Sequence, residues 1–184
     1  MRSPRLLVLA ACAAALAAAC DGQPAAVAPA DALLSSAGTE VNRALAEIRR
    51  GTAQFHRVEA AMAAGYAPAS PCVAHPFLGA MGFHYANFGL VDATVDPSAP
   101  EILVYAPAPG GGLRLVAAEF MVAAAPWDAL HSAPPMLAGV GFDDHRAPEA
   151  RHGIPLPHYD LHAWVWQHNP SGTFFPFNPT VSCG

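Results

Sequence analysis

The residues most suited to chemistry lie in an alternating stretch between Pro157 and Pro170. Read with a period of two, His158, Asp160 and His162 fall on one side of the chain, and the positions between them are mostly apolar or aromatic. Such alternation predicts a β-strand, in which residues two apart lie about 6–7 Å from each other on one face. Two imidazoles and a carboxylate there could bind a metal ion or exchange protons, although a polar face turned to solvent would need no function.

Two further ligand-type side chains interrupt apolar segments that also read as strands. His84 lies between aromatic residues, and Glu119 shares one side of its segment with alanine, leucine and methionine. A buried, unpaired carboxylate costs several kcal/mol, so an inward-facing Glu119 must be protonated, paired or bound to a cation. An ion pair with Arg114 or another arginine is the structural alternative.

Together, His84, Glu119 and His162 make a set of two histidines and one carboxylate drawn from three strands. This set suits iron(II), manganese or zinc and leaves coordination positions for water or substrate. Asp160 or His158 could be a fourth ligand, or a partner that fixes the tautomer of an imidazole. The sequence contains no His-Glu-x-x-His, Cys-x-x-Cys, Gly-x-Ser-x-Gly or phosphate-loop motif. We therefore expect a metal-binding protein. If coordination positions of the metal are open to substrate, the protein could also be an enzyme.

Two other functions compete with metal binding. The chain is rich in aromatic residues near its polar positions, and these could line a pocket for a sugar or a small apolar molecule: Phe83, Tyr85, Trp164, Trp166 and 174–177. In this alternative the protein is a small-ligand binding module without catalysis. The polar residues could instead form a satisfied buried network with a purely structural role.

The periodicity of the chain predicts an α+β fold. Apolar residues recur at helical spacing over 39–64, where Gly51 could divide the helix and Gly65 with Pro68 ends it. Short apolar segments with strand character follow at 81–85, 102–105, 113–122, 136–142 and 159–166. Because few helical patterns separate them, we expect an antiparallel sheet or small β-barrel with the helix region packed on it.

The charged, proline-containing segment 143–154 is predicted to be a surface loop. Its two histidines, His145 and His152, are expected to face solvent.

The N-terminal segment 1–20 has the pattern of an export signal: arginines, an apolar stretch, then small residues before Cys20. Cys20 resembles the lipidated cysteine of a bacterial lipoprotein box in which the leucine is displaced by one position. Residues 21–38 lack periodicity and read as a disordered tether, and 39–184 as one globular domain. The sequence thus predicts a protein anchored by lipid to a membrane, in the periplasm or at the cell surface; ordinary secretion is the alternative.

If Cys12 leaves with the signal and Cys20 carries lipid, Cys72 and Cys183 remain as one pair. In an oxidising compartment this pair should form a disulfide bond.

The composition excludes one class of partner. The 184 residues carry a net charge of −5 and contain no lysine and no basic cluster, which argues against nucleic acid as a partner. The nine histidines equal the arginines in number, and this enrichment favours metal binding.

Several blocks of the sequence resemble a family of small exported bacterial proteins, mostly uncharacterised. The block at 81–87 is similar to the family pattern M-G-x-H-Y-x-N, and the block at 159–170 to Y-[DE]-L-H-x-W-x-W-x-x-N-P. Further similar blocks lie at 100–105, 113–120 and 178–183. The resemblance implies functional roles for His84, Glu119, Asp160 and His162. It implies that His158 is not required for this role, and it does not indicate which reaction, if any, the protein catalyses.

Overall fold

The computed structural model describes residues 30–150 and 154–184. The export signal, Cys20, the first part of the tether and His152 lie outside the described residues. No helix in the described part of the chain combines the length and the apolar character that crossing a membrane requires.

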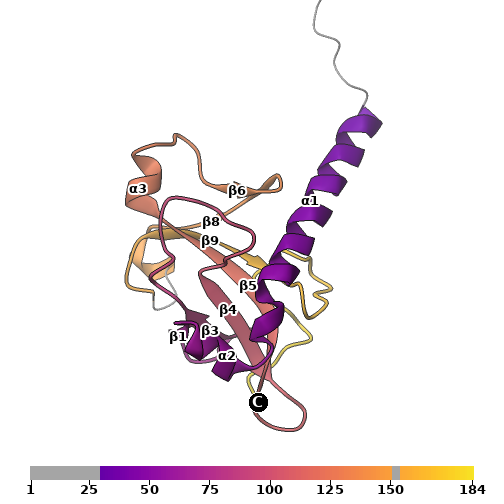
Figure 1. The fold of residues 1–184 in the computed structure, drawn as a ribbon, viewed down its shortest axis with the longest axis vertical. Coiled ribbons are helices and arrows are strands. Elements are labelled where there is room, and N and C mark those ends of the chain that lie inside the picture. Colours follow the sequence, from indigo (N-terminus) through magenta and orange to yellow (C-terminus); the bar gives the residue numbers. More distant parts are fainter. Residues whose placement is uncertain (1–29, 151–153) are drawn as a thin grey trace, which may run out of the picture.

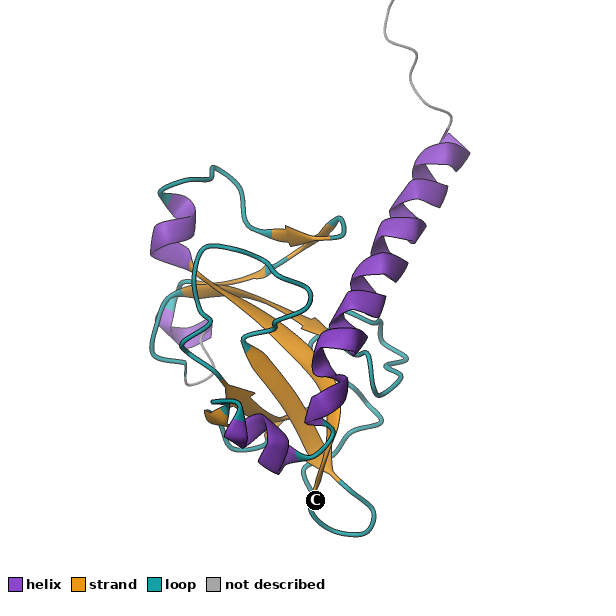
Figure 2. Ribbon diagram, in the orientation of Figure 1, coloured by secondary structure: helices purple, strands orange, loops and turns teal. Residues whose placement is uncertain are grey.

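The fold is α+β, as predicted, with a long helix packed on a mostly antiparallel sheet (Figures 1 and 2). Seven strands form the main sheet: β1 (Ala67–Pro68), β2 (Val73–His75), β3 (Gly79–Ala86), β4 (Ile102–Pro107), β5 (Leu113–Ala123), β8 (Asp143–His145) and β9 (His158–Ala163). Their order is β1-β3-β4-β5-β9-β8, with β2 also paired to β3. This path is open, so the sheet, rather than the barrel, is the alternative that the chain adopts.

One face of the sheet is covered by helix α1 (Ala30–Thr52). Leu45 and Ile48 of α1 pack with Phe120 of β5 and Leu161 of β9 in one hydrophobic cluster. Successive side chains of a strand point to opposite faces, so Ala117, Glu119 and Met121 of β5 must point away from the helix. The candidate ligands therefore belong to the face opposite α1.

The helix region ends as its glycines predict. A 3-10 turn, η1 (Ala53–Phe55), divides α1 from α2 (Val58–Ala63). An added Cβ on Gly51 would lie 2.0 Å from the backbone oxygen of Ser98, so only glycine fits this close approach. Gly65 has a φ of +95°. Its N–H donates to the carbonyl oxygen of Met62, and the N–H of Tyr66 donates to the carbonyl oxygen of Ala61, which is the pattern of a Schellman cap.

Several predicted boundaries were wrong. Helix α1 begins at Ala30, so 30–38 is helical, not a disordered tether. Strand β9 ends at Ala163, before the predicted Trp166. Instead of one strand over 136–142, β6 (Met136–Leu137) and β7 (Val140–Gly141) form a hairpin. Its turn residues Ala138 and Gly139 both have positive φ, as such a two-residue turn requires.

The largest error concerns the predicted surface loop at 143–154. Its first residues form β8, which pairs with β9 in a register that places Asp143 beside Asp160 and His145 beside His158. Only the later part contains a short 3-10 turn, η2 (Pro148–Ala150). The His145 side chain is 13% exposed, so the expectation that it faces solvent was wrong.

The predicted disulfide between Cys72 and Cys183 is confirmed. The two Cα atoms lie 5.7 Å apart, within the usual range for a disulfide. The bond joins the segment before β2 to the C-terminal tail, across 111 residues of sequence. It therefore fixes the C-terminal segment beside the strands that carry the site.

Candidate metal centre

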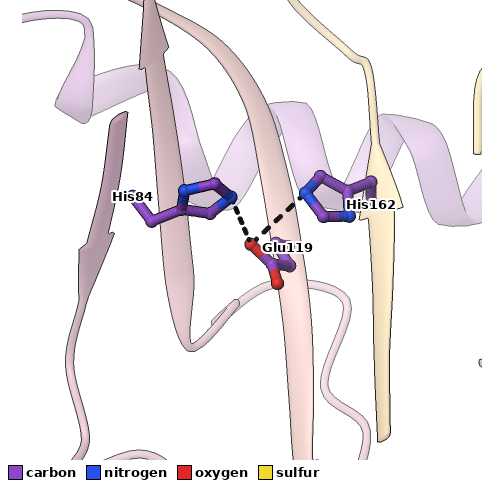
Figure 3. Close-up of side chains that lie close together, drawn as sticks. All are labelled: His84, Glu119 and His162. Carbon is purple, nitrogen blue, oxygen red and sulfur yellow. Dashed lines mark ion pairs between the residues drawn. The ribbon is translucent and has the colours of Figure 1, made fainter. Parts of the chain in front are cut away.

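Three strands bring His84, Glu119 and His162 together. Glu119 of β5 and His162 of β9 are direct neighbours in the antiparallel register. His84 lies on β3, with β4 between it and β5, and its cross-strand neighbour Val104 lies on the same face. Figure 3 shows the two imidazoles reaching from either side toward the Glu119 carboxylate. All three side chains are buried.

The distances within this group fit a shared ion better than direct hydrogen bonds. Nε2 of His84 lies 3.3 Å, and Nε2 of His162 3.5 Å, from Oε2 of Glu119. A charge-assisted bond between an imidazole N–H and a carboxylate is shorter, about 2.7–2.9 Å. Metal bonds of about 2.1 Å at tetrahedral angles place neighbouring ligand atoms roughly 3.4 Å apart. The two distances are therefore compatible with ligand atoms arranged around one cation.

The protonation of His84 is set by hydrogen bonds on its far side. The Ser70 hydroxyl donates its single hydrogen to the carbonyl oxygen of Pro71 at 2.7 Å. Its oxygen, 2.8 Å from Nδ1 of His84, must then accept a hydrogen from that nitrogen. A neutral His84 consequently carries its lone pair on Nε2, the atom that faces Glu119. Metal-binding histidines are commonly oriented by such an outer hydrogen bond.

Glu119 is placed where a carboxylate is unfavourable without a cation. Its side chain is 5% exposed, and Oε2 accepts no hydrogen bond from the part of the chain that the structure describes. Burial, followed by the charge of Asp160, raises the pKa of Glu119 well above its usual value. The predicted alternative, a pair with Arg114, does not form, because Arg114 donates to Oε1 of Gln167 at 2.8 Å.

Asp160 and His158 do not complete this ligand set but belong to a neighbouring one. Nε2 of His158 and Nε2 of His145 each lie 3.4 Å from Oδ2 of Asp160. Burial alone would raise the pKa of Asp160. The effect of the neighbouring histidines is larger, so the pKa is lowered: the imidazoles of His145 and His158 adjoin the carboxylate, and His162 contributes its charge. Asp160 is thus the ionised carboxylate of the two groups in the metal-free protein, and Glu119 the one that tends to hold a proton.

Sequence reasoning missed His145. It lies in a short segment with three other charged residues, without the apolar alternation that marks a strand. Its position beside His158, with the rings parallel and 5.3 Å apart, comes only from the pairing of β8 with β9. Asp143 and His145 are two residues apart, which is the spacing of side chains on one face of a strand. This is the sequence signal that could have found His145, and it is weak because it covers only two residues.

All six of these side chains line one cavity of about 300 Å³. Apolar side chains form much of the remaining wall, among them Val73, Met81 and Phe177. A small molecule could therefore reach both groups of ligands from the same space.

Most of the aromatic residues predicted to line a ligand pocket lie elsewhere. Trp164 is buried, and its indole N–H donates a hydrogen bond to the carbonyl oxygen of Phe175. The indole N–H of Trp166 donates a hydrogen bond to the hydroxyl of Thr52. Tyr85 packs edge-on against another tyrosine in the core. Of the predicted set, residues of the 174–177 run line the cavity that contains the two histidine–carboxylate groups and a second cavity beside it, and the other predicted residues line neither of these two.

Comparisons of the chain with models of known families, with curated proteins and with solved structures each found no match. The resemblance to small exported bacterial proteins therefore stays a prediction, and the function has to be argued from the geometry of the two histidine–carboxylate groups.

Proposed function

We propose that this protein is an exported, lipid-anchored metal-binding protein that holds a divalent transition metal at His84, Glu119 and His162. The observation that carries the proposal is the position of Glu119 Oε2, which is buried, accepts no hydrogen bond from any described residue and lies 3.3 and 3.5 Å from two imidazole nitrogens. A cation between these atoms removes the cost of burying the carboxylate. Iron, manganese and zinc all accept two imidazoles and a carboxylate.

The open side of the site favours a reactive ion over a structural one. Structural zinc sites are usually closed by four protein ligands, whereas catalytic sites keep three and leave one position for water or substrate. Here three ligands face a cavity of about 300 Å³. An ion in this position would act as a Lewis acid on a bound water or on a substrate oxygen.

Export and anchoring are supported by the sequence and by the disulfide. The bond between Cys72 and Cys183 is the kind that persists in oxidising compartments and is rare in the cytosol. The signal-type segment ending at Cys20 supplies the route and the lipidation site. Replacing Cys20 by alanine should move the protein from the membrane fraction to the soluble fraction, without loss of the disulfide. A Cys20→Ala protein that stays with the membrane would contradict lipid anchoring.

Elemental analysis of the full chain, purified without an affinity tag, tests metal binding directly. We expect stoichiometric transition metal in the wild-type protein and the loss of one equivalent, or at least a 100-fold weaker affinity for that equivalent, in His84→Ala and His162→Ala. His168→Ala is the matched control, because His168 is exposed and lies outside both groups. No bound metal in the wild-type protein, after incubation with iron(II), manganese(II) and zinc(II) in turn, would overturn the proposal.

A further inference from the structure

A second group of ligand-type side chains lies beside the first. Nε2 of His145 and of His158 are both 3.4 Å from Oδ2 of Asp160. The three ligand atoms all lie within 4.8 Å of one another, as do those of His84, Glu119 and His162. These distances again exceed a charge-assisted hydrogen bond and match the roughly 3.4 Å edge of a tetrahedral metal site.

The hydrogen bonding of His158 leaves its lone pair facing the carboxylate. Nδ1 of His158 lies 2.8 Å from the carbonyl oxygen of Leu156, and a carbonyl oxygen can only accept. Nδ1 therefore carries a hydrogen, and in the neutral ring Nε2 carries a lone pair directed at Oδ2 of Asp160. Two lone pairs face each other favourably only if a proton or a metal ion lies between them. The distance of 3.4 Å is longer than a charge-assisted hydrogen bond and leaves room for a metal ion.

The cavity is also rich in acidic groups. Four carboxyl groups line it, and no arginine is among its described lining residues. Arg146, at 2.7 Å, compensates Asp144, which leaves Glu119, Asp143 and Asp160 facing four imidazoles. Asp143 is exposed, whereas Asp160 is buried between two imidazoles. A second ion beside Asp160 would offset the cost of burying that carboxylate.

We propose that His145, His158 and Asp160 bind a second divalent transition metal, so that the cavity holds a pair of ions. The two sites share no ligand: one combines β3, β5 and β9, and the other β8 and β9. Alternation along β9 places His158, Asp160 and His162 on one face, so neighbouring residues of one strand supply both sites. Each ion keeps coordination positions toward the same space of about 300 Å³.

The metal content of single-site variants tests the second site separately from the first. The full chain is purified without a tag, stripped with a chelator, loaded with cobalt(II) and freed of excess metal. We expect two cobalt ions per chain in the wild type, one in His145→Ala, one in His84→Ala and none in the double variant. His145 suits the test because it lies on the edge strand β8, is 13% exposed and adds little to the core. The conservative change Asp160→Asn, which preserves the side-chain shape, should also reduce the content to one.

The number of cobalt ions bound per chain in each variant distinguishes the two proposals. One cobalt ion in the wild type, lost in His84→Ala and retained in His145→Ala and Asp160→Asn, overturns the second site and leaves the first intact. One ion that is lost in His145→Ala but retained in His84→Ala supports the second site and overturns the first. Two ions in both the wild type and His145→Ala overturn the assignment of ligands. The exposed control His168→Ala must retain the wild-type content.

Discussion

Replacing Glu119 by glutamine should have opposite effects on the metal-free and the metal-loaded protein. Glutamine preserves the shape of the side chain but cannot ionise. In the metal-free protein, burial and the charge of Asp160 oppose ionisation of Glu119, so the substitution should leave the stability unchanged or increase it. In the loaded protein it removes the only anionic ligand of the first site, so metal should no longer stabilise the fold through that site.

The size of the effect follows from binding linkage. At a metal concentration 100 times the Kd, binding to the native state adds about 2.7 kcal/mol to the free energy of unfolding. For a domain of this size, that corresponds to a rise in Tm of about 5–10 °C. If losing the carboxylate weakens binding 100-fold, the same metal concentration adds only about 0.4 kcal/mol, and Tm should rise by about 1–2 °C.

Thermal unfolding followed by near-ultraviolet circular dichroism, with and without metal, measures both effects. To isolate the first site, the comparison is made in the His145→Ala background, and Glu59→Gln is the matched control because the Glu59 side chain is 69% exposed. If Glu119 instead forms a stabilising ion pair with the two histidines, the metal-free glutamine variant should lose about 3–5 kcal/mol. Such a loss, together with a wild-type Tm that does not respond to metal, would refute the metal-site reasoning.

Three further predictions concern residues around the site. Ser70→Ala removes the acceptor that orients His84 and should weaken metal affinity about 10–100-fold without changing the stoichiometry; unchanged affinity in a competition titration would contradict this role. Burial raises the pKa of Glu101 from 4.5 to about 7, so the native state binds more protons than the unfolded state between these values and stability falls as pH rises through them. Glu101→Gln should remove about 3 kcal/mol of this pH dependence, measured by denaturant unfolding at pH 4.5 and 8; parallel pH profiles of the two proteins would exclude it. Replacing Cys72 and Cys183 by serine opens a loop of 111 residues and should cost about 5 kcal/mol in urea unfolding, whereas a loss below 1 kcal/mol would show that the tail is held by packing alone.

The sequence by itself determined the local features of this protein. Alternation between the prolines at 157 and 170 was sufficient to place His158, Asp160 and His162 on one face of a strand, because the side-chain period of a strand is two. An acid inside an apolar strand was sufficient to single out Glu119, since burying a carboxylate is costly. Counting cysteines paired Cys72 with Cys183. Each of these inferences depends on neighbours in the chain or on residue type.

Tertiary structure alone decided which of these residues meet. Strand order and register, which short sequence patterns do not encode, place His84 within 3.3 Å of Glu119 across an intervening strand. The same pairing turned His145, in a segment that looked like an exposed loop, into a neighbour of His158 and so divided the predicted ligands into two groups. Short edge strands such as β8 are held by their partner strand more than by their own sequence, so their residues can be assigned only after the sheet is known.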